Sequence, residues 1–333
     1  MRERTIASHF VRAALHGARL RDLDIPALLS EAGLPPAVLE ESAARVTAAQ
    51  YARLIRLLWR HLDDEYLGLA GQASLPGTFA MMACTIIHCG TLEKALRRGI
   101  RFYRLFPGSP EFTLRREGAQ AWLCLQVDPT HDPEHFLSES LLLIWHRLAS
   151  WLIGQRIALE ELCFAYAQPL HVAEYDLLFP GVRRFSAGFT GLRFAAAHLD
   201  QPLLQDERTL KRFLEQAPAD LLSRPAGDDS LIVRIQRLLG RDCRQWPDLE
   251  RLARQLNCSP QTLRRRLREQ GSSFQVIKDQ LRRDRAIYLL GRPELSIQEI
   301  AEQLGFSEAS AFHRAFRKWT RLTPGAYREP VEK

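Results

Sequence analysis

The sequence predicts an α+β domain followed by an all-α domain in which a linker helix joins two helix-turn-helix units. Helical patterns, a hairpin pattern and further strand-like runs succeed one another over residues 1–215, as in an α+β domain with a mostly antiparallel sheet. A helix-turn-helix pattern then occurs twice between residues 230 and 330, at a spacing of about 48 residues. The chain of 333 residues is long enough for two or three such domains.

The first 105 residues have mainly helical periodicity. Thr47 can cap a helix whose apolar positions run from Tyr51 to Leu62 at i, i+3, i+4 and i+7 spacing. Thr91 can cap a second helix, with inward positions from Leu92 to Tyr103.

Strand patterns begin after Pro107. Phe112–Val127 resembles two strands around a Glu117-Gly118 turn. A long helix is expected from about His135 to Gly154. Further strand-like runs lie at Leu159–Ala167 and Gly191–Phe194, with a short helix near Val172–Phe179.

A segment rich in proline separates the two domains. Residues 216–229 hold two prolines and a glycine and lack apolar periodicity, as linkers commonly do. We therefore expect a first domain at 1–215, a linker at 216–229 and the all-α domain at 230–330.

The positive charge lies in the last third of the chain. The formal net charge is +7, and residues 228–333 carry 21 Lys+Arg against 14 Asp+Glu, which leaves the rest neutral. A basic segment joined to a neutral one suggests that one part meets a polyanion while the other does something else. A solvated basic surface is the alternative that charge alone leaves open.

Several classes of protein are excluded by composition. The six cysteines form no CxxC pair and no zinc-finger spacing, which fits a reduced, cytoplasmic compartment. Residues 1–20 lack the apolar core of a secretory signal. Charged and hydroxyl side chains interrupt the longest apolar run, Phe136–Ile153, so we expect a buried helix there and no membrane partner.

The two helix-turn-helix copies align by their first helices. Matching apolar positions are Leu249, Leu252, Ala253 and Leu256 in the first copy and Ile297, Ile300, Ala301 and Leu304 in the second. Asn257 and Gly305 end these helices, where the chain needs a left-handed residue. The expected N-caps are Ser259 before Pro260, Ser296 in a capping box with Glu299, and Ser307.

The second helix of each copy has a buried and an outward face. Leu263 and Leu267 face inward in the first copy, and Phe312 and Phe316 do so in the second. The expected DNA-facing residues are Gln261, Thr262, Arg264, Arg265 and Arg268, and Ala309, Ser310, His313, Arg314 and Arg317. Arg pairs bidentately with guanine and Gln with adenine in the major groove. The equivalent Arg265 and Arg314 are the expected base readers, with contact to phosphate or solvent as the alternative.

One helix can connect the two units. Phe274–Leu290 has 17 residues, roughly 25 Å of helix, and successive major-groove sites on one face of DNA lie about 34 Å apart. This length is compatible with a protein that reads two grooves. The net charge, the doubled pattern and the caps favour that reading over an ordinary helical bundle with no role in DNA binding.

The second unit contains the segment IQEIAEQLGFSEASAFHRAFRKWTRLTPGAYR at 297–328, preceded by RRDRAIYLLGRPELS. These segments and the first unit resemble the AraC/XylS family of bacterial transcription regulators, over about 228–330. The resemblance implies two helix-turn-helix subdomains that read asymmetric or directly repeated sites in double-stranded promoter DNA, with RNA polymerase as a partner. The family positions that commonly touch bases fall on Gln261, Arg264, Arg265, Ser310, His313 and Arg314. Many members carry a bulkier residue where Gln261 stands.

Three stretches of the first domain resemble a sub-branch of this family with an arabinose-binding-type effector domain. They are HLDDEYLGLAGQ (61–72), GTLEKALRRGIRFYRLF (90–106) and EYDLLFPGVRRFSAGFTGLRFAAAHLDQPL (174–203). The resemblance implies that residues 1–215 form a homodimer and bind a small-molecule effector of unidentified chemistry. Effector-lining candidates are Phe79, Met81, Met82, Phe102, Tyr103 and Phe106, with plain core packing as the alternative reading.

Two short segments contain residues that could support metal binding or nucleophilic catalysis. DPTHDPEHF (128–136) can hold a metal, but a loop that caps the next helix is favoured, and core packing is favoured for ACTIIHCG (83–90) over a nucleophile–base pair. We therefore expect no catalytic residues, no metal and no cofactor. Two alternatives stay open: an enzyme domain that converts a metabolite, fused to a DNA-binding tail, and a first domain that only dimerises. The sequence leaves open whether the regulator is an activator or a repressor.

Overall fold

The computed structural model describes residues 5–179, 181–216, 231–240, 242–269 and 272–328. They group into two compact units. The central unit comprises His9–Ala32 and Tyr51–Pro225, and the C-terminal unit comprises Met1–Ser8, Gly33–Gln50 and Ala226–Lys333, as far as these ranges are described. Most of the linker expected at 216–229 lies outside the described residues. Within the described ranges, no helix is long and apolar enough to cross a membrane.

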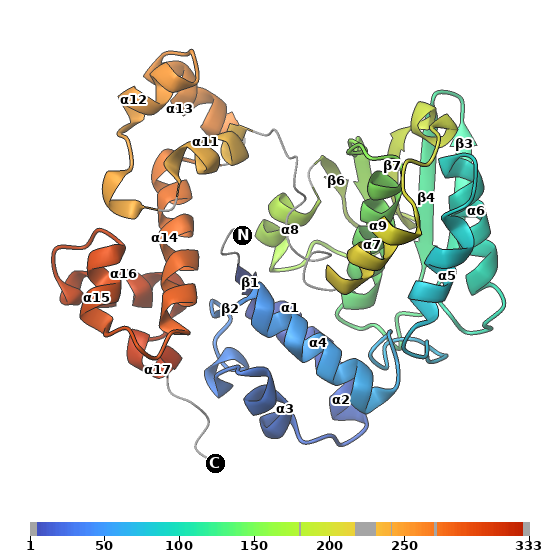
Figure 1. Cartoon of the computed structure of the whole chain (residues 1–333), viewed down its shortest axis with the longest axis horizontal. Helices are drawn as coiled ribbons and strands as arrows, with labels where there is room; N and C mark the ends of the chain where they lie inside the picture. The colour runs from blue at the N-terminus through green and yellow to red at the C-terminus, as the bar shows by residue number, and fades with distance from the viewer. Residues whose placement is uncertain (1–4, 180, 217–230, 241, 270–271, 329–333) are drawn as a thin grey trace. The chain divides into compact units, whose positions relative to one another are not determined.

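A five-stranded sheet forms one layer of the central unit (Figure 1). Among its described strands, which are ordered β3-β4-β7-β5-β6, β5 and β6 pair in parallel and the other neighbours are antiparallel. The strands are β3 (Glu111–Glu117), β4 (Gln120–Gln126), β5 (Glu161–Cys163), β6 (Val182–Arg184) and β7 (Thr190–Ala195). This mostly antiparallel sheet confirms the α+β class predicted for the first domain.

β3 and β4 form the expected hairpin, with Glu117 opposite Gln120. Gly118 takes a φ of 60° in the two-residue turn, where glycine avoids the steric cost of the left-handed region. The turn is therefore Gly118-Ala119, one residue later than the sequence pattern predicted.

The remaining elements that lie wholly or mostly in the central unit are helical. They are α1 (Ser8–Ala14), α2 (His16–Leu20), α3 (Ile25–Ala32), α4 (Ala48–Leu62), α5 (Thr78–Ile86), α6 (Leu92–Tyr103), α7 (Phe136–Leu152), α8 (Val172–Leu178), η2 (Ala196–Asp200) and α9 (Glu207–Gln216). The predicted caps of α4 and α6 are confirmed, because Thr47 accepts from the amide of Gln50 at 3.2 Å and Thr91 from that of Lys94 at 3.4 Å. The long apolar helix α7 is confirmed as a buried helix: its Leu142, Leu148 and Leu152 are inaccessible to solvent.

A buried carboxylate organises the loop beside α2. Asp64 is 1% exposed and accepts from the amides of Tyr66, Gly68 and Ser74 at 2.7–2.9 Å. The loop backbone that it holds packs directly on Gly17 of α2, because a Cβ there would lie 1.8 Å from the carbonyl oxygen of Leu67. Only glycine allows this approach of helix and loop.

The C-terminal unit contains the remaining helices. They are η1 (Pro36–Val38), α11 (Leu231–Leu239), η3 (Cys243–Gln245), α12 (Leu249–Gln255), α13 (Pro260–Glu269), α14 (Phe274–Leu290), α15 (Ile297–Gln303), α16 (Ala309–Thr320) and α17 (Pro324–Arg328). The linker helix α14 has the bounds that the sequence predicted. The all-α class predicted for residues 230–330 is confirmed.

A two-stranded ribbon from the start of the chain belongs to this C-terminal unit. β1 (Thr5–Ala7) pairs antiparallel with β2 (Arg45–Thr47). Thr5 donates from Oγ1 to Asp284 of α14 and accepts from Nε of Arg45 at 2.8 Å. Tyr327 of α17 donates from its hydroxyl to the carbonyl oxygen of Arg45 at 2.6 Å. The sequence pattern predicted mainly helix here, since three-residue strands are too short to give a strand periodicity.

The Gly17 contact yields a stability test. Gly17→Ala is expected to lower the free energy of unfolding of the central unit by roughly 1–3 kcal/mol or more, because the new methyl displaces backbone. Gly90→Ala is the control, since a Cβ there meets nothing within 4 Å. Urea unfolding followed by circular dichroism measures both; equal stability of the two variants would contradict the packing.

The ribbon contact yields a second test. Tyr327→Phe is expected to weaken the hold on the β1–β2 ribbon by about 1 kcal/mol, because it removes a hydrogen bond between buried groups. Amide hydrogen exchange of Ile6 and Val46 should accelerate. Tyr288→Phe is the matched control, because its hydroxyl pairs with Arg292 in an exposed contact and should leave ribbon exchange unchanged.

Candidate nucleic-acid interface and effector site

The two helix-turn-helix units have equivalent cores. In the first, the buried residues include Leu252, Ala253, Leu256, Leu263 and Leu267. In the second, they include Ile300, Ala301, Leu304, Phe312 and Phe316. These are the positions that the sequence alignment paired, so the apolar spacing alone identified both cores.

The helix ends follow the predicted local chemistry with one exception. Asn257 and Gly305 take φ values of 52° and 79° after α12 and α15. Ser259 accepts from the amide of Thr262 at 3.1 Å, and Ser296 with Glu299 forms the capping box. The prediction that Ser307 caps α16 was wrong. The N-cap position of α16 is Glu308, whose side chain instead accepts from the hydroxyl of Ser310 at 2.9 Å.

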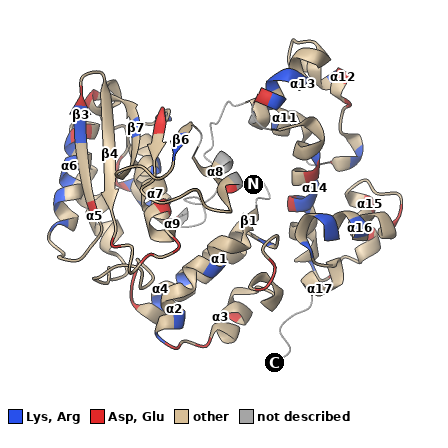
Figure 2. Cartoon of the chain, turned by 180° about the vertical axis from the view of Figure 1, so that it is seen from behind, with Lys and Arg blue, Asp and Glu red and all other residues tan. Residues whose placement is uncertain are grey.

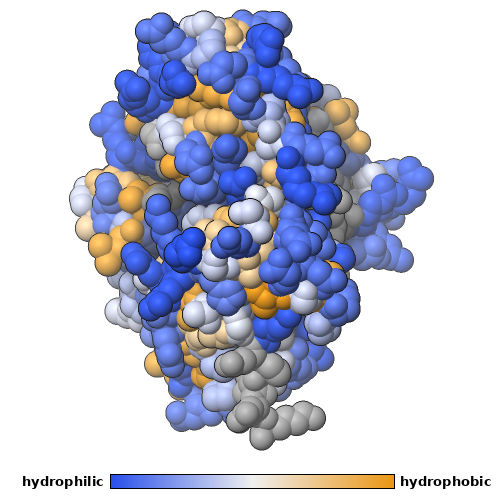
Figure 3. All heavy atoms as spheres, turned by 90° about the vertical axis from the view of Figure 1, so that its left-hand side faces the viewer, coloured by the Kyte–Doolittle hydropathy of each residue, from blue (hydrophilic) through white to orange (hydrophobic). Residues whose placement is uncertain are grey.

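The expected DNA-facing side chains lie on the outward faces of α13 and α16. The exposed members are Gln261, Arg264, Arg265, Arg268, Ser310, His313, Arg314 and Arg317, while Thr262 and Ala309 are half-buried. Basic segments mark α13 and α16 in Figure 2. Figure 3, seen from the side where these helices lie in Figure 1, shows hydrophilic side chains over much of that face. Such a polar, basic surface suits a polyanion.

Arg265 has a partner on its own helix. Its Nη1 lies 2.9 Å from Oε1 of Glu269 in an exposed i, i+4 pair. Exposed pairs of this kind contribute about 0.3–0.5 kcal/mol, whereas a bidentate contact with a base discriminates by about 1–3 kcal/mol. Breaking the ion pair with Glu269 would therefore cost less free energy than a bidentate contact between Arg265 and a base would contribute.

One helix serves both cores. Near its start, Ile277 of α14 is buried in the first core, and from Ala286 to Leu290 the helix is buried in the second. Between these ends, Arg282 donates to the carbonyl of Leu304 at 3.2 Å and lies over the rings of Trp246 and Phe306. The 17 residues of α14 are thus fixed in place at both ends.

The aromatic and methionine residues predicted to line an effector pocket are divided between core and surface. Met82 and Tyr103 are buried, Phe79 and Phe102 half-buried, and Met81 and Phe106 exposed. Phe102 meets both Tyr103 and Phe106 at ring-centroid distances of 5.5 Å. Their role in effector binding stays a prediction.

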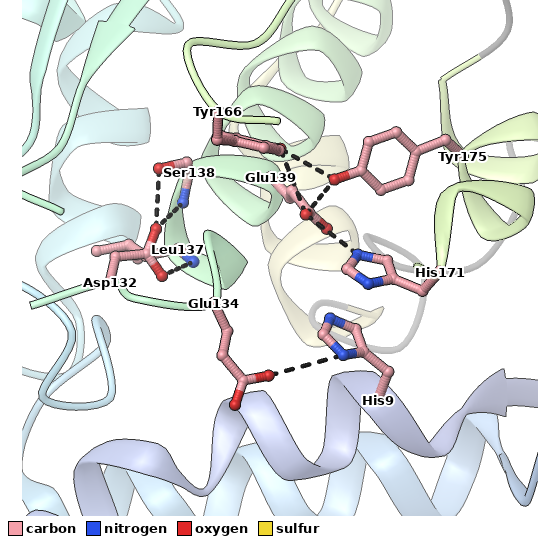
Figure 4. Close-up of polar contacts among 9 residues, drawn as sticks. All are labelled: His9, Asp132, Glu134, Leu137, Ser138, Glu139, Tyr166, His171 and Tyr175. Carbon is pink, nitrogen blue, oxygen red and sulfur yellow. Dashed lines mark hydrogen bonds and ion pairs between the residues drawn. The ribbon is translucent and has the colours of Figure 1, made fainter. Parts of the chain in front are cut away.

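A buried polar cluster lies elsewhere in the central unit (Figure 4). Glu139 of α7 is 3% exposed, and its Oε1 accepts from the hydroxyls of Tyr175 and Tyr166 and lies 3.4 Å from Nε2 of His171. His9 of α1 stacks on His171 at a centroid distance of 3.6 Å. We call these five residues the Glu139 cluster.

The Glu139 cluster was missed by the sequence analysis. Its members come from α1, α7, α8 and the loop after β5, so no local spacing connects them. The available signal was a carboxylate inside the apolar run Phe136–Ile153, which sequence reasoning attributed to an amphipathic helix. Burial and the charge of Glu139 raise the pKa of Tyr166 and Tyr175, so both phenols stay protonated and donate.

The other two motifs have structural roles. Asp132 accepts from the amides of Leu137 and Ser138 at 2.9 Å and so caps α7, as favoured for the DPTHDPEHF segment. In ACTIIHCG, Cys89 is buried, but Cys84 and His88 are exposed, and His88 pairs with Glu207 at 3.2 Å. Core packing is therefore correct for Cys89 and wrong for Cys84 and His88.

Family models match both parts of the chain. Residues 23–203 match the arabinose-binding domain of AraC transcription regulators, and residues 252–330 match a helix-turn-helix domain. The chain belongs to the AraC family of transcription regulators. It is a DNA-binding regulator with an N-terminal domain of the effector-binding type, and not an enzyme.

Relatives cover nearly the whole chain of this AraC-family regulator. It is 40% identical over 310 residues to the regulator VirS of Mycobacterium tuberculosis, covering 89% of this chain and 88% of VirS. It is 28% identical to the ornithine utilization regulator of Pseudomonas aeruginosa, covering 91% and 90%. Among solved structures, the regulator CdpR of Pseudomonas aeruginosa is 21% identical, with 96% and 98% covered and a TM-score of 0.31.

Burial of His146 makes the stability of the central unit depend on pH. Its Nε2 donates to the carbonyl of Ile157 at 2.8 Å, and burial lowers its pKa from 6.5 to about 4. Between those values the unfolded chain binds a proton that the folded unit does not. The contribution of neutral His146 to stability is therefore complete above pH 6.5. As the pH falls from 6.5 to 4, the free energy of unfolding decreases by roughly 3 kcal/mol.

Urea midpoints at pH 7 and pH 5 measure this effect. His146→Asn should reduce the difference between the two midpoints, whereas the exposed control His61→Asn should keep it. An unchanged difference in His146→Asn would assign the acid sensitivity to other groups, such as His9.

Proposed function

We propose that this regulator reads two successive major grooves of promoter DNA with α13 and α16. The supporting observation is the equivalence of the two units. Each has a buried apolar core and an exposed polar recognition face, and α14 connects their cores. At roughly 25 Å, α14 is long enough to carry recognition helices toward sites about 34 Å apart.

Within each recognition helix we assign different roles to the exposed residues. Arg265 and Arg314 stand at equivalent positions and read bases, with Gln261 and His313 on the same outward faces. Arg264, Arg266 and Arg268 contact phosphates or solvent, and the phosphate contacts make binding strongly dependent on salt.

We further propose that residues 1–215 form a homodimer and bind a small-molecule effector. A ligand changes promoter occupancy only if it binds one state of the protein more tightly than another. One relative is named for ornithine utilization, which supports a response to a small metabolite. We also propose that the protein acts in the cytoplasm, where it binds promoter DNA and contacts RNA polymerase.

Base reading is tested by selection of random duplex DNA with the purified chain. Two sequence blocks about one helical turn apart are expected. Arg265→Ala and Arg314→Ala should each cost roughly 1–3 kcal/mol on the selected site and relax preference in one block.

Arg101→Ala, an exposed arginine of α6, is the matched control and should retain both blocks. If Arg265→Ala instead weakens binding to all sequences about equally, Arg265 contacts phosphate only. A single enriched block would mean that one helix-turn-helix unit contacts only the sugar–phosphate backbone of the DNA.

A further inference from the structure

Among the residues that the structure describes, three polar atoms in or beside the Glu139 cluster find no hydrogen-bond partner although they are shielded from solvent. They are Oε2 of Glu139, Nε2 of His9 and the hydroxyl of Tyr51. Glu139 is 3% exposed and Tyr51 is fully buried. Leaving a buried polar group unpaired destabilises the folded state, and a charged group does so more strongly, so three together call for an explanation.

Tyr51 of α4 is the third group. Burial, with the charge of Glu139 as the second cause, raises the pKa of Tyr51 well above 10. The phenol is therefore protonated, and its oxygen also offers lone pairs to a donor.

His9 also presents an acceptor. Burial, His171 and Arg12 lower its pKa to about 4, so the ring is neutral at pH 7. Its Nδ1 faces Oε2 of Glu134 at 3.7 Å (Figure 4). A proton on Nδ1, toward that carboxylate, leaves the lone pair on Nε2.

The three unpaired atoms are therefore one carboxylate oxygen, on Glu139, and two further hydrogen-bond acceptors, on His9 and Tyr51. Aromatic rings pack on the tyrosines of the cluster: the ring centroid of Phe164 lies 5.2 Å from those of Tyr175 and Phe185, and the ring of His135 stacks on Tyr166 at 3.8 Å. A negative charge with acceptors and aromatic faces favours an organic cation, by charge-assisted hydrogen bonds and by cation–π attraction.

We propose that the Glu139 cluster, with Tyr51, recognises the ammonium or guanidinium group of a small organic cation, which is the effector. This inference rests on the proposed effector function of residues 1–215. It places polar recognition at Glu139 rather than at the aromatic residues around Phe102. The cation donates to Oε2 of Glu139, and Tyr51 and His9 accept its remaining hydrogens.

Chain connectivity relates this site to the DNA-binding helices. His9 stands two residues after β1, and Tyr51 stands four residues after β2. The same two strands hold α14 and α17 through Thr5, Asp284, Arg45 and Tyr327. A ligand that fixes His9 and Tyr51 thus acts on the residues that lead directly out of the ribbon, and so biases the unit that contains α14.

The experiment uses the full-length chain and paired probes. Butylammonium, lysine and agmatine are titrated by calorimetry and thermal shift, with 1-butanol and butyrate as neutral and anionic counterparts. At least one cation is expected to bind and to raise Tm, while the counterparts do neither. If only the neutral or anionic probes bind, the cation proposal is overturned, whereas effector binding by residues 1–215 stands.

Variants then locate the site. Glu139→Gln should weaken the cation about tenfold or more, and Tyr51→Phe about threefold to tenfold. Tyr51→Phe removes an unpaired hydroxyl, so it should fold at least as stably as the parent, and it decides the matter if Glu139→Gln does not fold. Glu65→Gln at a half-buried carboxylate and Tyr66→Phe at a buried phenol, both in the same unit and outside the cluster, are the controls.

Unchanged cation affinity in both Glu139→Gln and Tyr51→Phe would overturn the site. So would loss of binding in Phe102→Ala with retention in Glu139→Gln. Affinity for the selected DNA is then measured with and without the cation. A cation that binds through Glu139 and leaves DNA affinity unchanged supports the site and rejects its role as effector in the proposed function.

Discussion

Burial of a single helix by two separate cores is the constraint on which the C-terminal unit depends. The apolar side chains of α14 enter the first core at Ile277 and the second from Ala286 to Leu290. Because interiors are close-packed, a shift of α14 in one core disturbs the packing of the other. Both recognition helices, α13 and α16, therefore pack in cores that share α14. The position of α14 sets the spacing between their outward faces.

The ribbon extends this constraint to the beginning of the chain. Thr5 and Arg45 connect β1 and β2 to Asp284 and Tyr327 by hydrogen bonds of which the Tyr327–Arg45 bond is buried. Residues from near the N-terminus thereby stabilise the helices that follow residue 231. The two strands belong to the C-terminal unit and run directly into α1 and α4, most of whose residues belong to the central unit.

The central unit combines a satisfied polar framework with an unsatisfied one. The carboxylate oxygens of Asp64 and Asp132 accept hydrogen bonds from backbone amides. Asp64 thereby fixes the loop beside α2, and Asp132 fixes the start of α7. Glu139 is similarly buried, but among the described residues one of its carboxylate oxygens receives no hydrogen bond. The contrast separates carboxylates that hold the fold from one that is available to a ligand, since buried polar groups in folded proteins are otherwise paired.

The sequence by itself determined what depends on local spacing: the two helix-turn-helix cores, the bounds of α14, the hairpin, the buried helix α7 and the caps at Thr47, Thr91, Ser259 and Ser296. These follow from helical and strand periodicity and from capping chemistry, which act within a few residues. Tertiary structure decided the rest. The ribbon pairs Thr5 with Thr47 and joins them to Asp284, and the Glu139 cluster brings together His9, Glu139 and Tyr175. Such contacts join residues far apart in the chain, and their energy comes from burial and pairing that no local pattern encodes.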